Sequence, residues 1–136
     1  MEHKPPAPLC KAFLACRQII QDLASKEFVL LGPTHQFHAP VFPMIGGLSF
    51  FAQCTSMQGA YSLELQLQDM DGNAEWHHAF EPPWECNDPL NVAYLSLQNL
   101  GIYFPHPGKY DIVLLANGEE LARLPFWARL PVETTP

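Results

Sequence analysis

A stretch of eight residues, 61–68, constrains the fold of this chain more than any other part of the sequence. Apolar and polar residues alternate strictly along it, from Tyr61 to Gln68. Successive side chains of a β-strand point to opposite faces, so the pattern predicts a strand with one buried face and one wet face. Residues 69–73 then supply turn chemistry, with Gly72 able to adopt positive φ, and residues 74–80 are expected to pair back.

The rest of the chain consists of short apolar runs separated by Gly, Pro and Asn. Asn117-Gly118 is a strong hairpin signal, because a type I′ turn needs positive φ at both positions. Pro40, Pro43 and Pro125 cannot donate to a central ladder, so they indicate edge or irregular segments. These breaks predict many short strands joined by tight turns.

The first apolar run, at 12–20, could instead be a short helix. Its β-branched and aromatic residues favour a strand, and the polar turn at 22–26 favours a hairpin with the next run at 28–31. The sequence therefore predicts an all-β fold, an antiparallel β-sandwich of seven to eight strands. The expected strands cover residues 12–20, 28–31, 48–54, 61–68, 74–80, 92–104, 110–116 and 121–130.

The length of the chain fits a single domain covering residues 1–136. Residues 1–9 are expected to form an extended arm and residues 131–136 a frayed tail. A chain of this size buries enough surface to fold without a metal or a disulfide. The four cysteines include no C-x-x-C pair, and no secretion signal is recognisable, so free thiols are expected. They are Cys10, Cys16, Cys54 and Cys86.

The charge balance limits the expected partners. Only 15% of the residues are charged, and 14 acidic residues against 7 basic ones give a formal net charge of −7. Such a field repels phosphate backbones and anionic lipids, so neither nucleic acid nor a membrane is expected as a partner. No apolar run is long enough to cross a membrane, and a cytoplasmic location is expected. Few charges leave an apolar surface, which favours a protein partner or a homo-oligomer.

The last third of the chain carries a recognisable order of residues. Phe104-x-x-Pro107-Gly108-x-Tyr110-x-Ile112 comes first, then Asn117-Gly118, then the apolar run at 121–130. This order resembles an immunoglobulin-like or fibronectin-like module, in which a Pro-Gly-x-Tyr step opens a late strand and a tight hairpin closes the pair.

Over roughly residues 12–130, the chain is similar to a family of small uncharacterised bacterial β-sandwich proteins. The resemblance implies an immunoglobulin-like sandwich and assigns no activity or site. The residues that carry it, besides those of the last third, are the run around Cys16, Leu30-Leu31-Gly32 and Asp69-x-Asp71-Gly72.

Six histidines suggest a metal site, but their spacing does not require one. His35 and His38 are the weak candidates, with Cys54 or Cys86 as possible further ligands. Zinc sites usually contain close Cys or His pairs, so no metal and no other cofactor is expected. No nucleophile motif is present, and no catalytic residue is assigned.

The proline-rich loop at 81–90 is the preferred binding surface. It holds Trp84 between two glutamates, and an aromatic residue with a polar rim is typical of an interface centre. Ordinary packing over the end of the sandwich is the simpler interpretation for any single aromatic residue. The candidate binding residues are Trp76, Glu81, Trp84, Glu85 and Asn87.

Three classes of function follow. The favoured one is a non-enzymatic binding or assembly module that acts through loop 81–90 or through an exposed sheet edge. The second is a carbohydrate or small-ligand binding domain, with the tryptophans stacking on the ligand and Glu81, Glu85 or Asn87 bonding its hydroxyls. The third is a hydrolase or a metal-dependent enzyme using His35, His38, His77 or Cys86.

Overall fold

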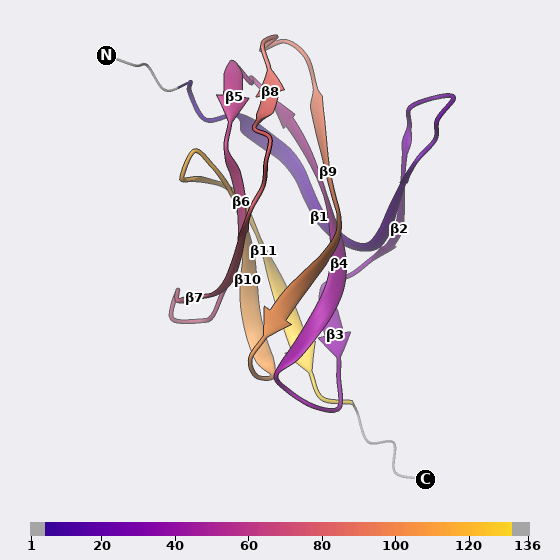
Figure 1. The fold of residues 1–136 in the computed structure, drawn as a ribbon, viewed down its shortest axis with the longest axis vertical. Coiled ribbons are helices and arrows are strands. Elements are labelled where there is room, and N and C mark those ends of the chain that lie inside the picture. The colour runs from indigo at the N-terminus through magenta and orange to yellow at the C-terminus, as the bar shows by residue number, and fades with distance from the viewer. Residues whose placement is uncertain (1–4, 132–136) are drawn as a thin grey trace.

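The computed structural model describes residues 5–131 (Figure 1), and these residues form eleven strands and no helix. The all-β class is confirmed. The outer ends of the predicted arm and tail, residues 1–4 and 132–136, lie outside the described residues. The strands are β1 Leu9–Gln21, β2 Phe28–Pro33, β3 Gln36–His38, β4 Met44–Thr55, β5 Gly59–Tyr61, β6 Leu63–Gln68, β7 Ala74–Ala79, β8 Trp84–Cys86, β9 Ala93–Phe104, β10 Gly108–Ala116 and β11 Glu119–Arg129.

The strands form three sheets in the described part of the chain. A four-stranded sheet has the order β2-β1-β4-β9, and a five-stranded sheet has the order β3-β11-β10-β6-β7. A small sheet of β5 and β8 lies at the end of the molecule where β1 begins (Figure 1). The prediction of purely antiparallel sheets is wrong at one place, because β3 pairs parallel with β11.

The two larger sheets share one hydrophobic core. On β6 the predicted alternation is present, with Leu63, Leu65 and Leu67 buried and the glutamate and glutamines between them only half-buried. Phe104 of β9 packs on Phe126 of β11, with ring centroids 5.7 Å apart. Burying side chains of this size stabilises the fold by about 1.5–3 kcal/mol each.

Two predicted turns are also confirmed. Asn117 and Gly118 both have positive φ, 50° and 81°, and join β10 to β11. Between β6 and β7, the Asp69 carboxylate accepts the backbone N–H groups of Asp71 and Asn73, both at 2.9 Å. Gly72 in that turn has φ 84°. Local sequence therefore determines where these strands reverse.

The predicted immunoglobulin-like class is not confirmed. The Pro-Gly-x-Tyr step is present, and the Tyr110 hydroxyl donates to the backbone carbonyl of His106. However, the five-stranded sheet is mixed, and the four-stranded sheet carries a long hairpin, β1–β2, that extends beyond the core (Figure 1).

Among residues 5–131 no helix is long and apolar enough to serve as a membrane span.

Candidate functional site

Strand β2 forms an uncovered edge of the four-stranded sheet. It pairs with β1 on one side, and no strand of the described chain pairs with its other side. Its first four residues, 28–31, are Phe-Val-Leu-Leu and carry no charge. Natural edge strands are normally protected by charged side chains, prolines or bulges. Only Gly32-Pro33, at the end of β2, interrupts this edge.

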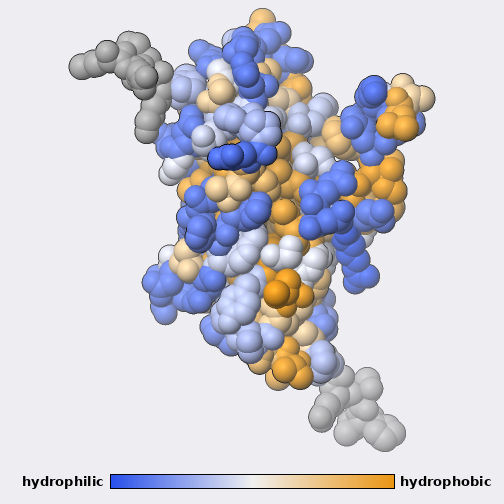
Figure 2. Space-filling view, viewed as in Figure 1, coloured by the Kyte–Doolittle hydropathy of each residue, from blue (hydrophilic) through white to orange (hydrophobic). Residues whose placement is uncertain are grey.

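The hairpin exposes a strip of apolar side chains beside that edge. Val29 is 47% exposed, Leu31 is 41% exposed, and Ile20 on the neighbouring strand is 43% exposed. Ile20 lies opposite Val29 in the β1–β2 register, and Gln18 lies opposite Leu31, so the three apolar residues share one face. We call Ile20, Val29 and Leu31 the hairpin strip. Figure 2 shows hydrophobic surface on the lobe that this hairpin forms.

The turn of the hairpin is ordered by one aspartate. The Asp22 carboxylate accepts the Ser25 hydroxyl at 2.8 Å and the Ala24 backbone N–H at 3.2 Å. These bonds favour the ionised form, so the pKa of Asp22 lies below its ordinary value, the Ser25 bond being the main cause. Lys26 closes the turn with φ 64°. The turn of the hairpin is therefore held by specific hydrogen bonds, although the hairpin projects beyond the core.

An aromatic trio holds the far end of the hairpin against the sheet. The Phe28 ring lies 5.4 Å from that of Phe51 on β4 and 5.9 Å from that of Tyr94 on β9, between ring centroids. The Phe51 and Tyr94 rings stack at 5.7 Å. A groove of about 360 Å³ lies beside the trio, with Lys26 and Glu27 in its wall. These contacts fix the direction in which the hairpin strip faces.

The predicted binding residues of loop 81–90 are spread over more than one element. Trp84 lies in β8, opposite Tyr61 of β5, and is half-buried against the core. Glu81, Glu85 and Asn87 are exposed, and only the last two are joined, by a 3.3 Å bond from the Asn87 amide to the Glu85 carboxylate.

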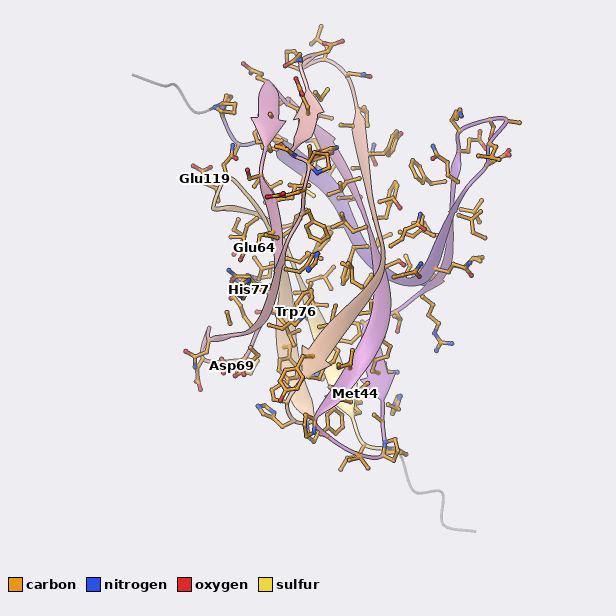
Figure 3. All side chains as sticks on the ribbon, viewed as in Figure 1. Met44, Glu64, Asp69, Trp76, His77 and Glu119 are labelled. Atoms are coloured by element: carbon orange, nitrogen blue, oxygen red, sulfur yellow. The ribbon has the colours of Figure 1, made fainter. Side chains whose placement is uncertain are left out.

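Trp76 belongs to the five-stranded sheet, on β7, and packs against the core as well. Figure 3 places Trp76 and His77 on opposite sides of β7, as alternation in a strand requires. Both candidate tryptophans thus have packing roles. A role for these five residues in ligand binding stays a prediction.

The weak metal candidates lie near each other in sequence but have different neighbours. The exposed His35 ring meets the edge of the Trp127 ring at 5.8 Å, and the exposed His38 lies on β3 opposite Arg129. Cys54, proposed as a further ligand, is fully buried and lies opposite Cys10. Within residues 5–131 no three His, Cys, Asp or Glu side chains are grouped as metal ligands would be.

A cationic and aromatic cluster on β10 and β11 was not predicted from the sequence. The Lys109 ammonium lies 5.5 Å from the centre of the Trp127 ring, and the Arg129 guanidinium lies 5.8 Å from it. Cations at this distance are attracted to an indole ring. A groove of about 560 Å³ runs along these residues. The sequence signal was weak, since the two cations are twenty positions apart and meet only through the β10–β11 pairing.

The fold and these surfaces define a class of protein: an all-β chain with an uncovered, apolar strand edge. Residues 11–129 match the family of unknown function DUF6941, so the chain belongs to that family. The predicted likeness to an uncharacterised family is confirmed, whereas its immunoglobulin-like part is not. No curated protein matches the sequence.

Among solved structures, the chain is similar to part of the Pseudomonas fluorescens alkylpurine DNA glycosylase AlkC bound to DNA containing an abasic site analog. The similarity covers 70% of this chain and 28% of that chain, with 15% sequence identity and a TM-score of 0.42. The prediction that nucleic acid is excluded as a partner is not retained. That prediction rested on net charge alone, whereas the potential at a surface depends on local clusters such as Lys109 and Arg129. The similarity itself assigns no site to this chain.

Proposed function

We propose that this chain is a non-enzymatic assembly module whose β2 edge pairs with β2 of a second copy. The observation that carries the proposal is the uncovered run Phe28-Val29-Leu30-Leu31 at the sheet edge. Strand addition to an open edge supplies main-chain hydrogen bonds, and the side chains beside the edge supply specificity. The favoured surface is the sheet edge rather than loop 81–90, because Trp84 is engaged with the core.

A second copy fits this edge better than an unrelated strand. Two copies related by a twofold axis meet through the same surface, and β2 places no charge against itself. In the antiparallel register centred on Leu30, Val29 of one copy lies opposite Leu31 of the other. The apolar side chains of the two edges therefore face each other in this arrangement.

The test introduces a charge at the edge. Val29→Lys places one lysine from each copy in the proposed contact, so we expect the dimer dissociation constant to rise at least about a hundredfold, equivalent to about 2.7 kcal/mol. Val41→Lys is the matched control, because Val41 is 69% exposed and lies outside the strands. Sedimentation velocity over a range of micromolar concentrations measures both. A monomeric wild-type protein, or equal behaviour of the two variants, would contradict the proposal.

A second candidate function is the binding of an anionic ligand at the Trp127 cluster. Among the described residues, the ion pairs involve Arg123 and leave Lys109 and Arg129 without a carboxylate partner. Two such cations on one indole form a site for a phosphate or carboxylate group. Tryptophan fluorescence during titration with pyrophosphate tests it. A response that survives in the double variant Lys109→Ala, Arg129→Ala would reject this site.

A further inference from the structure

Two cysteines from distant parts of the sequence lie directly opposite each other. Cys10, at the start of β1, is the register partner of Cys54, near the end of β4. Residues directly opposite in an antiparallel pair have Cα atoms about 4.5–5.5 Å apart. Disulfides close over Cα distances of about 4.4–6.8 Å, so the backbone already satisfies the main geometric requirement. A bulge after Cys10 gives this end of β1 some local irregularity.

The two thiols differ in access and in acidity. Cys54 is fully buried, whereas Cys10 is half-buried between the exposed Leu9 and Lys11. The Cys54 thiol, which lies opposite Cys10, lowers the pKa of Cys10 to about 7. Its neighbour Cys10, together with burial, raises the pKa of Cys54. An accessible thiolate with a buried thiol behind it is an arrangement suited to oxidation.

The other two cysteines lack these features. Cys16 is fully buried opposite Ser49, and burial raises its pKa. Cys86 is half-buried on β8 and lies opposite Gly59, so no thiol faces it in the strand register. Cys16 and Cys86 therefore serve as internal controls for the reactivity of Cys10.

We propose that Cys10 and Cys54 form a redox modification site, in which a peroxide converts the two thiols to a cross-strand disulfide. The Cys10 thiolate attacks one peroxide oxygen, the O–O bond breaks, and Cys10 becomes a sulfenic acid while the other oxygen leaves and takes up a proton as water or an alcohol. The Cys54 sulfur then attacks the Cys10 sulfur, the S–O bond breaks, and water leaves with the Cys54 proton. The thiols lose two electrons and the peroxide gains them.

The segment that precedes Cys10 is already packed against the rest of the fold. The Pro6 carbonyl accepts the Tyr61 hydroxyl at 2.8 Å, and Pro8 is buried. Oxidation at Cys10 would therefore fasten a segment that is already packed, without moving β1 away from β4. This explains why the reaction requires little rearrangement of the strands.

The experiment treats the whole protein with one equivalent of hydrogen peroxide, blocks the remaining thiols and maps the disulfides by peptide mass spectrometry. We expect a Cys10–Cys54 linked peptide in the wild type and in the control Cys86→Ser. In Cys54→Ala the resolving thiol is missing, so a sulfenic acid should accumulate at Cys10 and react with dimedone. A linkage between other cysteines, or only disulfides between separate chains, would overturn the proposal.

A second measurement does not depend on the disulfide. Alkylation of Cys10 at pH 7 should be about threefold faster than alkylation of an ordinary thiol, because the larger thiolate fraction outweighs the lower nucleophilicity. Its midpoint should lie near pH 7 in the wild type. In Cys54→Ala the midpoint should move up toward about 8.5, the value of a free cysteine. A midpoint that is the same in both proteins would remove Cys54 as the cause.

Discussion

The hairpins β1–β2 and β6–β7 are built alike but end in different edge strands. Each turn is organised by one aspartate, Asp22 or Asp69, whose carboxylate accepts bonds from the following residues. Each second strand lies at the outer edge of its sheet.

The edge of β7 carries polar residues, among them Glu75, His77 and His78, and its large apolar residue Trp76 packs against the core. The edge of β2 carries only apolar side chains over residues 28–31. Polar side chains protect an edge from pairing with another chain. The difference therefore favours β2 over β7 as the edge for the proposed assembly.

The largest expected effect comes from placing the same charge on each edge. Leu31→Glu should raise the dimer dissociation constant about a hundredfold or more, because the twofold contact buries two carboxylates without partners. His77→Glu on β7 should leave it unchanged. Light scattering at matched concentrations compares the two variants. If His77→Glu dissociates the dimer as well, the assignment of assembly to β2 fails.

A smaller effect is expected from removing the aromatic anchor of the hairpin. Phe28→Ala should lower the free energy of unfolding by about 2 kcal/mol, less than for a fully buried phenylalanine, because Phe28 is half-buried. Leu23→Ala, at an 84% exposed position in the same hairpin, should change it by less than about 0.5 kcal/mol. Urea unfolding measures both. Equal effects would show that the Phe28–Phe51–Tyr94 contact does not hold the hairpin.

The smallest expected effect is a pH dependence of turn stability that the two hairpins share. Hydrogen bonds, chiefly from Ser25 to Asp22 and from the Asn73 backbone to Asp69, lower the pKa of both carboxyl groups. A lowered pKa means that each turn is stabilised while its carboxylate is ionised, above the unfolded pKa of about 3.9. That stabilisation is lost as the pH falls through the lower, folded pKa.

Hydrogen exchange between about pH 5 and pH 2, corrected for its intrinsic pH dependence, measures this loss at the two turns. Protection at residues 22–27 should fall in parallel with protection at residues 69–73. Asp22→Asn should remove the dependence from the first turn only. Loss from both turns in that variant would mean that the two hairpins are not independent.

The features that could be predicted from the sequence are the local ones. Alternation located β6, and the turn residues at 69–73 and 117–118 located two hairpins, because periodicity and turn chemistry act within a few residues. The parallel pairing of β3 with β11 could not be predicted in this way. A parallel pair needs a long connection and leaves no tight-turn signal.

The Trp127 cluster shows how far one irregularity limits prediction. Counting outward from the two-residue turn at Asn117-Gly118, Lys109 would face Phe126 across the hairpin. A bulge between the pairs of Leu114 and Leu115 shifts the register by one residue, and Lys109 lies opposite Trp127 instead. A one-residue shift moves a side chain to the other face of the sheet, so the cluster depends on a bulge that no residue pattern indicated.

The sequence predicted a hairpin at 12–31 and named an exposed sheet edge as one binding surface. It did not indicate that β2 of this hairpin is the strand that stays unpaired on one side. That depends on β4 pairing with the first half of β1 and on Phe28 contacting Phe51 and Tyr94. Both are contacts between distant parts of the chain. The same holds for Cys10 and Cys54, which sequence spacing gave no reason to pair.

Strand β1 pairs with different strands along its length. Its first part, up to Cys16, is paired with β4 beside the core, and the residues after Cys16 are paired with β2 alone. A strand shared in this way allows its outer half to open while its inner half stays folded, as a separate unit of local unfolding. Opening of the hairpin at the β2 edge would thus leave the pairing of β1 with β4 intact.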